Sequence, residues 1–185
     1  LLLLLPSFVY AFIWKYRYKD LLYGWKPNPL NIAGMILLVA AGFFLNAAHL
    51  HKLRSPLQTD HYTWRMMLGI MMPLFTAALP EELFFRAYLQ TRLEKLLRSP
   101  LVAILITSLL FTAWHLPSRY LLSHGVEGQA GNWMAVFTHT GIPVFIISVL
   151  LGSHWIMRRN IIALILVHWA IDILPSISSY FGISY

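Results

Sequence analysis

Long apolar runs recur along the whole chain and constrain its fold more than any other feature. A soluble core of 185 residues would need polar faces on its helices, whereas these runs contain few charged residues. Each approaches the roughly 20 residues that a helix needs to cross a bilayer. The runs lie at about 1–16, 30–48, 64–85, 100–117, 133–156 and 161–180. They predict an all-α fold, a polytopic membrane helix bundle with about six transmembrane segments.

Composition agrees with a membrane protein and excludes several other classes. Hydrophobic residues make up 58% of the chain and charged residues 11%, against about 25% charged in soluble proteins. Cysteine is absent, which excludes disulfides, a thiolate nucleophile and a cysteine-ligated zinc. The formal charge of +7 lies in short stretches between the apolar runs, so we expect no nucleic-acid partner. We interpret 1–185 as a single integral-membrane domain, whose start without methionine suggests N-terminal truncation.

Basic residues gather in alternate loops and indicate an orientation in the membrane. The first, third and fifth loops contain Lys15, Arg17, Lys19, Lys26, Arg92, Lys95, Arg98, Arg158 and Arg159. Loops rich in lysine and arginine usually face the cytoplasm, so we expect these three loops on that side. Lys52, Arg54 and Arg65 in the second loop depart from the pattern. We expect the surrounding lipid bilayer to be the cell (inner) membrane of a prokaryote.

Three acidic residues, Glu81, Glu82 and Asp172, lie inside apolar runs. A charge at the centre of a membrane helix costs roughly 2.5–3.5 kcal/mol, so such residues usually face a bundle interior or a water-filled cavity and mark function. A plainer interpretation is that Glu82 and Arg86, four residues apart, neutralise each other on one helix face. That pair does not explain Glu81, because the residue four positions after it is Phe85.

Two histidines in later apolar runs supply partners for these acids. His115 lies near the end of the fourth run, and His168 lies four residues before Asp172, on the same helix face. A single histidine in a membrane helix is as often a hydrogen-bonded packing residue as a site residue. Together, however, six such residues from three runs favour one inward-facing polar site. Its candidate catalytic residues are Glu81, Glu82, Arg86, His115, His168 and Asp172.

This set contains the parts of a hydrolytic site. An apolar environment disfavours the charged carboxylate and suits it to general base chemistry, whereas a nearby arginine favours the charge. One glutamate can then take a proton from water that one histidine holds, while the other histidine and its partner stabilise an oxyanion. Alternatively, a divalent metal such as zinc is bound by Glu81, His115, His168 and Asp172, whose ligand types match. The zinc-protease pattern H-E-x-x-H is absent, so metal dependence stays open and no other cofactor is expected.

The order and spacing of these residues resemble the CPBP family, which contains the CAAX proteases and bacteriocin-processing enzymes. The motifs are E-E-x-x-x-R at Glu81, Glu82 and Arg86, F-x-x-x-H at Phe111 and His115, and H-x-x-x-N/D at His168 and Asp172. The resemblance covers about residues 64–175, which we interpret as a CPBP-like catalytic core. It implies a helical bundle around a water-filled polar cavity, in which Glu82 and Arg86 support the site.

The resemblance also implies the roles of the other four residues. Glu81 would be the base that activates water, and His115 would help to position that water. His168 and Asp172 would form the oxyanion-binding side. The eukaryotic and archaeal CAAX-processing members have asparagine at the position of Asp172. An ionised aspartate cannot donate a hydrogen bond to an oxyanion, so it must be protonated, bind a metal or orient His168, and we favour the last.

The resemblance predicts an intramembrane endopeptidase that hydrolyses a peptide bond of a membrane-anchored protein or peptide. Prenylated CAAX tails, leader peptides and C-terminal membrane sorting tags are all candidate substrates. The main alternative is a non-catalytic protein of the same fold that binds a partner or confers immunity. Intramembrane acids and histidines also build proton relays, so a proton-coupled transporter is a further alternative, although the sequence shows no inverted halves.

The remaining histidines give weaker signals. We expect a loop position and contact with water for His49, His51, His61 and His124. His139 and His154 lie in the fifth run without an acidic residue four positions away. A place for His139 on the wall of the cavity is a less favoured interpretation.

Overall fold

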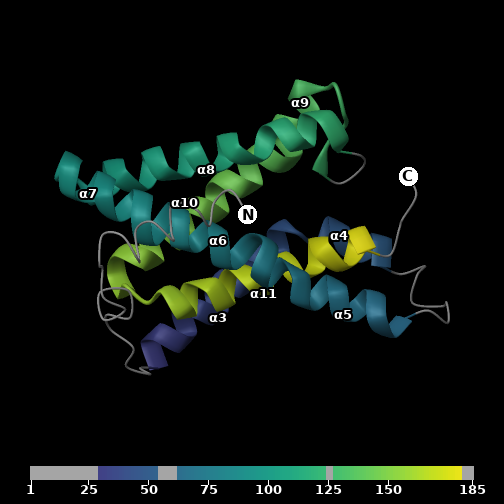
Figure 1. The fold of residues 1–185 in the computed structure, drawn as a ribbon, viewed down its shortest axis with the longest axis horizontal. Coiled ribbons are helices and arrows are strands. Elements are labelled where there is room, and N and C mark those ends of the chain that lie inside the picture. Colours follow the sequence, from purple (N-terminus) through teal and green to yellow (C-terminus); the bar gives the residue numbers. More distant parts are fainter. Residues whose placement is uncertain (1–28, 54–61, 124–126, 181–185) are drawn as a thin grey trace.

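The computed structural model describes residues 29–53, 62–123 and 127–180, which form a helical bundle (Figure 1). The α-helices in chain order are α3 (Pro29–Leu45), α4 (Ala48–Leu53), α5 (Tyr62–Pro73), α6 (Leu79–Glu81), α7 (Thr91–Leu97), α8 (Pro100–Leu122), α9 (Trp133–Val136), α10 (Ile142–Arg158) and α11 (Ile161–Tyr180). In these described ranges, π-helical geometry occurs at η3 (Leu74–Ala78), η4 (Glu82–Gln90) and η6 (Phe137–Gly141). Within the described ranges no strand forms beyond an isolated bridge between Gln129 and Asn132. The predicted all-α fold is confirmed.

Within the part of the chain that the structure describes, four continuous helical stretches are long and apolar enough to cross a membrane. They are Met66–Leu97, Pro100–Leu122, Trp133–Arg158 and Ile161–Ser178. The helix α3 is also apolar but shorter, at 17 residues, and the predicted run 1–16 lies outside the described residues. The first of the four stretches continues beyond the predicted end of its run at residue 85, because TRLEKLL consists largely of good helix formers. Helices of this length and hydropathy indicate an integral membrane protein.

Specific residues mark where these helices begin and end. The Ser99 hydroxyl accepts a hydrogen bond from the Val102 amide at 3.4 Å, and Pro100 occupies the first turn of α8, where its missing N–H is not needed. Helices α7 and α10 end at Arg98 and Arg159, which have left-handed φ angles of 53° and 50°. Both arginines line the same pocket. The basic third and fifth loops therefore lie at the same end of the bundle, as the charge pattern indicates.

Helix α11 lies among the other helices and contacts most of them. It packs against α3, α4 and α5 and also contacts η3, η4 and α10, while α10 packs along α8 (Figure 1). The apolar core between them consists of Ala78, Ala87, Ile147, Leu151, Trp155, Ile161, Leu164, Ile165, Val167 and Ile171. The core thus joins the stretch that carries both glutamates to α10 and α11, and it fixes how these three segments face one another.

A glycine allows α5 to approach α11 closely. A β-carbon at Gly69 would lie 2.8 Å from the Ile177 α-carbon, a backbone atom that cannot rotate away. We therefore expect Gly69→Ala to lower the free energy of unfolding by about 1–3 kcal/mol, because the two helices must move apart. Thermal unfolding of the purified protein in detergent measures this change.

The matched control for this substitution is Gly34→Ala. No atom lies within 4 Å of a β-carbon added at Gly34, and alanine favours a helix over glycine. We expect the control variant to melt at or slightly above the temperature of the unmodified protein. A Gly69→Ala variant with the same melting temperature as Gly34→Ala would contradict the close approach of α5 and α11.

Candidate active site

The two adjacent glutamates lie where the helix departs from regular α geometry. Pro80 has no backbone N–H and cannot supply the hydrogen bond that continues a regular helix. The π-helical segments η3 and η4 lie on either side of it. Glu81 is the last residue of α6, and Glu82 is the first residue of η4. π-Helical turns are rare in proteins, and those that occur often lie at functional sites. The irregular backbone is therefore a second indication that this pair of glutamates is functional.

The carboxylates of Glu81 and Glu82 have different environments. Glu82 is fully buried, its Oε1 accepts a hydrogen bond from His168 Nδ1 at 2.7 Å, and its Oε2 lies 3.4 Å from Arg86 Nε. Glu81 is 7% exposed and lines a cavity. Its Oε2 is buried and has no hydrogen-bond partner among the described residues. Neighbouring side chains therefore contact both oxygens of Glu82, through a hydrogen bond at Oε1 and an ion pair at Oε2, although Oε2 also lacks a hydrogen bond among the described residues. Glu81 presents one oxygen to the cavity side of the site.

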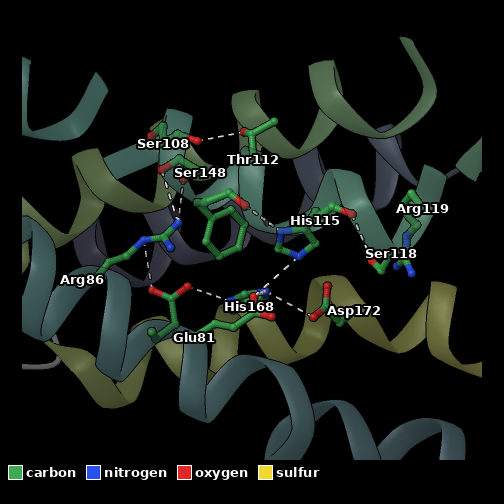
Figure 2. Close-up of polar contacts among 12 residues, drawn as sticks. Glu81, Arg86, Ser108, Thr112, His115, Ser118, Arg119, Ser148, His168 and Asp172 are labelled. Atoms are coloured by element: carbon green, nitrogen blue, oxygen red, sulfur yellow. Dashed lines mark hydrogen bonds and ion pairs between the residues drawn. The ribbon is translucent and has the colours of Figure 1, made fainter. Parts of the chain in front are cut away.

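Two imidazole rings from different helices face this oxygen of Glu81. His115 Nε2 on α8 lies 3.8 Å from Glu81 Oε2, and His168 Nε2 on α11 lies 3.9 Å from the same atom (Figure 2). Both separations exceed the length of a direct hydrogen bond. His115 Nδ1 donates to the Phe111 carbonyl oxygen at 2.8 Å, since a carbonyl oxygen only accepts. The Nε2 lone pair of a neutral His115 is therefore directed to Glu81.

A carboxylate lies at each ring nitrogen of His168. Besides the Nδ1 contact with Glu82, His168 Nε2 lies 3.2 Å from Asp172 Oδ2, one turn further along α11. A ring that donates from both nitrogens has no lone pair left for a metal ion. Within the described ranges, moreover, no three or more histidine, aspartate and glutamate side chains are arranged to hold a metal ion. In this arrangement the four candidate ligands do not fit a shared metal site.

Arg86 connects the glutamate pair to α8 and α10. Its Nη2 donates to the Ser148 hydroxyl at 3.1 Å and to the Ser148 carbonyl oxygen at 3.5 Å. Its guanidinium carbon lies 4.5 Å from the centre of the Phe111 ring, within cation–π range. Like Glu82, Arg86 is fully buried. Arg86 therefore fixes the position of Glu82 and, through the Glu82 contact, that of His168.

Further hydrogen bonds join the glutamate-bearing stretch to α10. Gln90 Nε2 donates to the Gly152 carbonyl oxygen at 2.9 Å, and Trp155 Nε1 donates to the Thr91 hydroxyl at 3.1 Å. The α10 partners 148, 152 and 155 follow one another at about one helical turn. Hydrogen bonds between helices are a common means of fixing their relative rotation in a membrane. This row of contacts therefore fixes the direction in which the glutamates project.

A cavity of about 510 Å³ lies beside Glu81, and His115 and Asp172 also line it. His139 of η6 lines the same cavity, so the less favoured interpretation of this histidine is the correct one. Two further charged residues on the wall, Arg119 and Glu127, were not predicted. The sequence could have indicated Arg119, because it follows His115 by four residues and therefore lies on the same helix face as His115.

The prediction that His49 is a solvated loop residue is wrong. Both His49 and His51 lie in α4, and the side chain of His49 is buried because α4 packs against α11. His49 Nδ1 forms a hydrogen bond of 2.8 Å with the Ser178 hydroxyl. His61 and His124 lie outside the described residues.

A comparison with models of known families identifies the family of this chain. Residues 63–174 match a family described as Type II CAAX prenyl endopeptidase Rce1-like, and this match covers more than half of the chain. The chain belongs to the Rce1-like family. The predicted resemblance to the CPBP family, of which these proteins are part, is thereby confirmed. No curated protein and no solved structure matches the chain.

Membership of the Rce1-like family supports the general part of the predicted function. Its endopeptidases act in the membrane, so the family supports an intramembrane peptidase with a membrane-associated protein or peptide as substrate. The four helical stretches among the described residues that are long and apolar enough to cross a membrane agree with this location. The roles of the individual site residues and the inner membrane of a prokaryote stay predictions.

Proposed function

We propose that this Rce1-like protein is an intramembrane endopeptidase in which Glu81 activates the hydrolytic water. The observation that carries the proposal is the position of Glu81 Oε2. This atom is buried, lacks a hydrogen-bond partner among the described residues, and lies 3.8 and 3.9 Å from the Nε2 atoms of His115 and His168. A carboxylate in such a position beside a cavity is suited to accept a proton from water. Glu82 is not, because its oxygens already face His168 and Arg86.

The reaction begins when Glu81 accepts a proton from a water molecule. The water oxygen attacks the carbonyl carbon of the scissile peptide bond, and the carbonyl oxygen becomes an oxyanion. When the tetrahedral intermediate collapses, the C–N bond breaks and the proton on Glu81 passes to the leaving nitrogen. The Nε2 lone pair of His115 accepts a hydrogen bond from the other hydrogen of the water and so orients its oxygen. Glu81 thus acts first as a base and then as an acid.

His168 is the oxyanion-binding group in this proposal. Its Nε2 lies between Glu81 Oε2 and Asp172 Oδ2, at 3.9 and 3.2 Å, so its N–H can donate to an oxyanion that forms beside Glu81. Glu82 holds Nδ1, and Asp172 accepts from the single Nε2–H and so keeps the ring oriented until the oxyanion takes this hydrogen bond. Donors that are already oriented towards the developing charge stabilise the transition state most, because they do not have to reorganise.

The test of this function uses the full chain in lipid nanodiscs and a peptide with an S-farnesyl cysteine in a C-terminal CAAX sequence. Mass spectrometry identifies the products. We expect cleavage within the CAAX sequence, and slower cleavage of the same peptide without the farnesyl group, because lipid anchoring delivers the bond to the membrane. A second measurement covers other substrates. Quantitative proteomics compares cells that contain the unmodified protein with cells that contain Glu81→Gln. An intact peptide together with an unchanged proteome would overturn the proposal.

Replacement of Asp172 separates the orienting role from metal ligation. Asp172→Asn keeps an oxygen that accepts from His168, so we expect activity within about tenfold of the unmodified enzyme, the usual effect of one altered hydrogen bond. Asp172→Leu removes the charge-assisted hydrogen bond and should lower kcat about 10–100-fold. Steady-state cleavage of the farnesyl peptide measures both effects. Loss of all activity in Asp172→Asn, with restoration by added zinc, would show that Asp172 is a metal ligand instead.

A further inference from the structure

An ion pair on the cavity wall has no role in the chemistry proposed above. Arg119 Nη2 lies 3.0 Å from Glu127 Oε1, and both residues line the cavity that also holds Glu81 and His115. Arg119 follows His115 by one turn of α8 (Figure 2). The side chains of Arg119 and Glu127 are 36% and 29% exposed, so a molecule in the cavity can reach both.

We propose that Arg119 binds a carboxylate of the substrate. Before the substrate binds, the carboxylate of Glu127 pairs with the Arg119 guanidinium, and the substrate carboxylate then takes its place. This inference rests on the proposed peptidase function and adds a specificity residue to the same site. Among the described residues that line the cavity, Arg119 is the one lysine or arginine. Its guanidinium presents five donors in a planar fork that matches the two oxygens of a carboxylate. Glu127 meets it through one nitrogen, which leaves other donors for an incoming anion.

Replacement of Glu127 by a substrate carboxylate needs little change in the protein. Partly exposed ion pairs contribute little to stability, so Arg119 loses little when this partner leaves. The backbone beside Glu127 is held independently of its side chain, because the Thr140 hydroxyl donates to the Glu127 carbonyl oxygen at 2.6 Å. The carboxylate of Glu127 can therefore turn away while its backbone stays in place.

The distance along α8 limits where the substrate carboxylate can lie. Four residues of α-helix span about 6 Å, and an extended peptide advances about 3.3 Å per residue. With the reach of both side chains, a carboxylate on Arg119 lies about two to four residues from a scissile bond held beside His115. The carboxylate comes either from the C-terminus of the substrate or from an aspartate or glutamate side chain at that distance.

Three S-farnesyl CAAX peptides of otherwise identical sequence distinguish these sources. The first has a free C-terminal carboxylate, the second a C-terminal amide, and the third a C-terminal amide with aspartate as its last residue. Their affinity for the Glu81→Gln protein in nanodiscs is measured by fluorescence anisotropy, so that no turnover interferes. We expect a carboxylate-bearing peptide to bind about 10–100-fold more tightly than the plain amide, as for other charge-assisted contacts. Equal affinity for all three peptides would overturn the inference.

Two substitutions, each introduced into the same Glu81→Gln background, connect this preference to the ion pair. Arg119→Gln should abolish the preference and leave binding of the plain amide unchanged, whereas a merely structural role would weaken all peptides alike. Glu127→Gln should strengthen binding of the carboxylate-bearing peptide severalfold, because the competing anion is gone, and this gain cannot result from misfolding. Arg158→Gln, at the end of α10, is the control for loss of one positive charge. A preference unaffected by both cavity substitutions would also overturn the inference.

The proposed function and this inference can fail separately. Cleavage of acid and amide peptides at equal rates by the unmodified enzyme would keep the peptidase and remove the role of Arg119. Selective binding of the acid without cleavage of any peptide would keep the carboxylate site and remove the peptidase.

Discussion

Glu81→Gln should lower the rate of peptide hydrolysis by a factor of about 10²–10⁴, the usual contribution of a general base, while the protein stays folded. Glutamine has the size of glutamate but cannot accept a proton from water at neutral pH. The buried Oε2 that faces His115 and His168 is then replaced by a neutral amide atom. Because Glu81 Oε2 has no hydrogen-bond partner among the described residues, its removal should cost little stability.

The measurement for this prediction is kcat with the farnesyl peptide, together with the melting temperature in detergent. Glu94→Gln is the matched control, since Glu94 pairs with Arg159 at one end of the bundle, away from the residues that line the cavity. We expect near-normal activity for the control. Hydrolysis by Glu81→Gln at more than a tenth of the normal rate would exclude Glu81 as the base.

Replacement of Arg86 should have the largest effect on stability. Arg86→Met leaves the Glu82 carboxylate buried without its guanidinium and removes the donor to Ser148. Loss of one partner from a buried ion pair typically costs about 3–5 kcal/mol, because the remaining charge is uncompensated. We therefore expect Arg86→Met to unfold far more easily than the unmodified protein. Denaturation in increasing SDS, with tryptophan fluorescence as the signal, measures the free energy of unfolding.

The double variant Glu82→Gln with Arg86→Met tests the reason for this loss. Without the buried carboxylate, methionine at position 86 leaves no uncompensated charge, so the double variant should be more stable than Arg86→Met alone. Arg158→Met is the control for the loss of one arginine and should change stability little. Equal stability of the single and double variants would show that the uncompensated carboxylate of Glu82 is not the cause.

The helical architecture followed from the apolar runs, because a run of that length and composition has few other stable forms in a membrane. What the runs could not predict was the π geometry at 74–78, 82–90 and 137–141. The same residues support α and π turns with similar side-chain patterns, and Pro80 indicates an interruption but not its form. The apolar runs did not predict that the stretch Met66–Leu97 continues to Leu97. Hydropathy indicates where a helix leaves the lipid, whereas the helix itself can continue beyond that point.

The clustering of the polar site residues was predictable from the sequence, because a charge in a membrane helix usually faces a bundle interior or a cavity. The structure brings Glu81, Glu82, His168 and Asp172 into contact in a way that their order in the chain could not show. Spacing pairs Arg86 with Glu82 and not with Glu81, but it does not show that Glu82 is fully buried while Glu81 lines the cavity. Ser148, which binds Arg86, carried no signal, since serine is common where membrane helices pack.

The pairing of Glu82 with Arg86 also bears on how the chain enters the bilayer. Met66–Leu97 has a mean hydropathy of 1.3, below the 2.0 of the stretches that contain α10 and α11. Its insertion into the bilayer therefore costs more free energy than the insertion of those two stretches. Ser148 and His168, the later partners of this pair, have not been synthesised when that stretch emerges from the ribosome. Glu82 and Arg86 lie four residues apart on one stretch and can neutralise each other before any other helix arrives. We therefore expect the contact that supports the finished site also to ease the insertion of the segment that carries it.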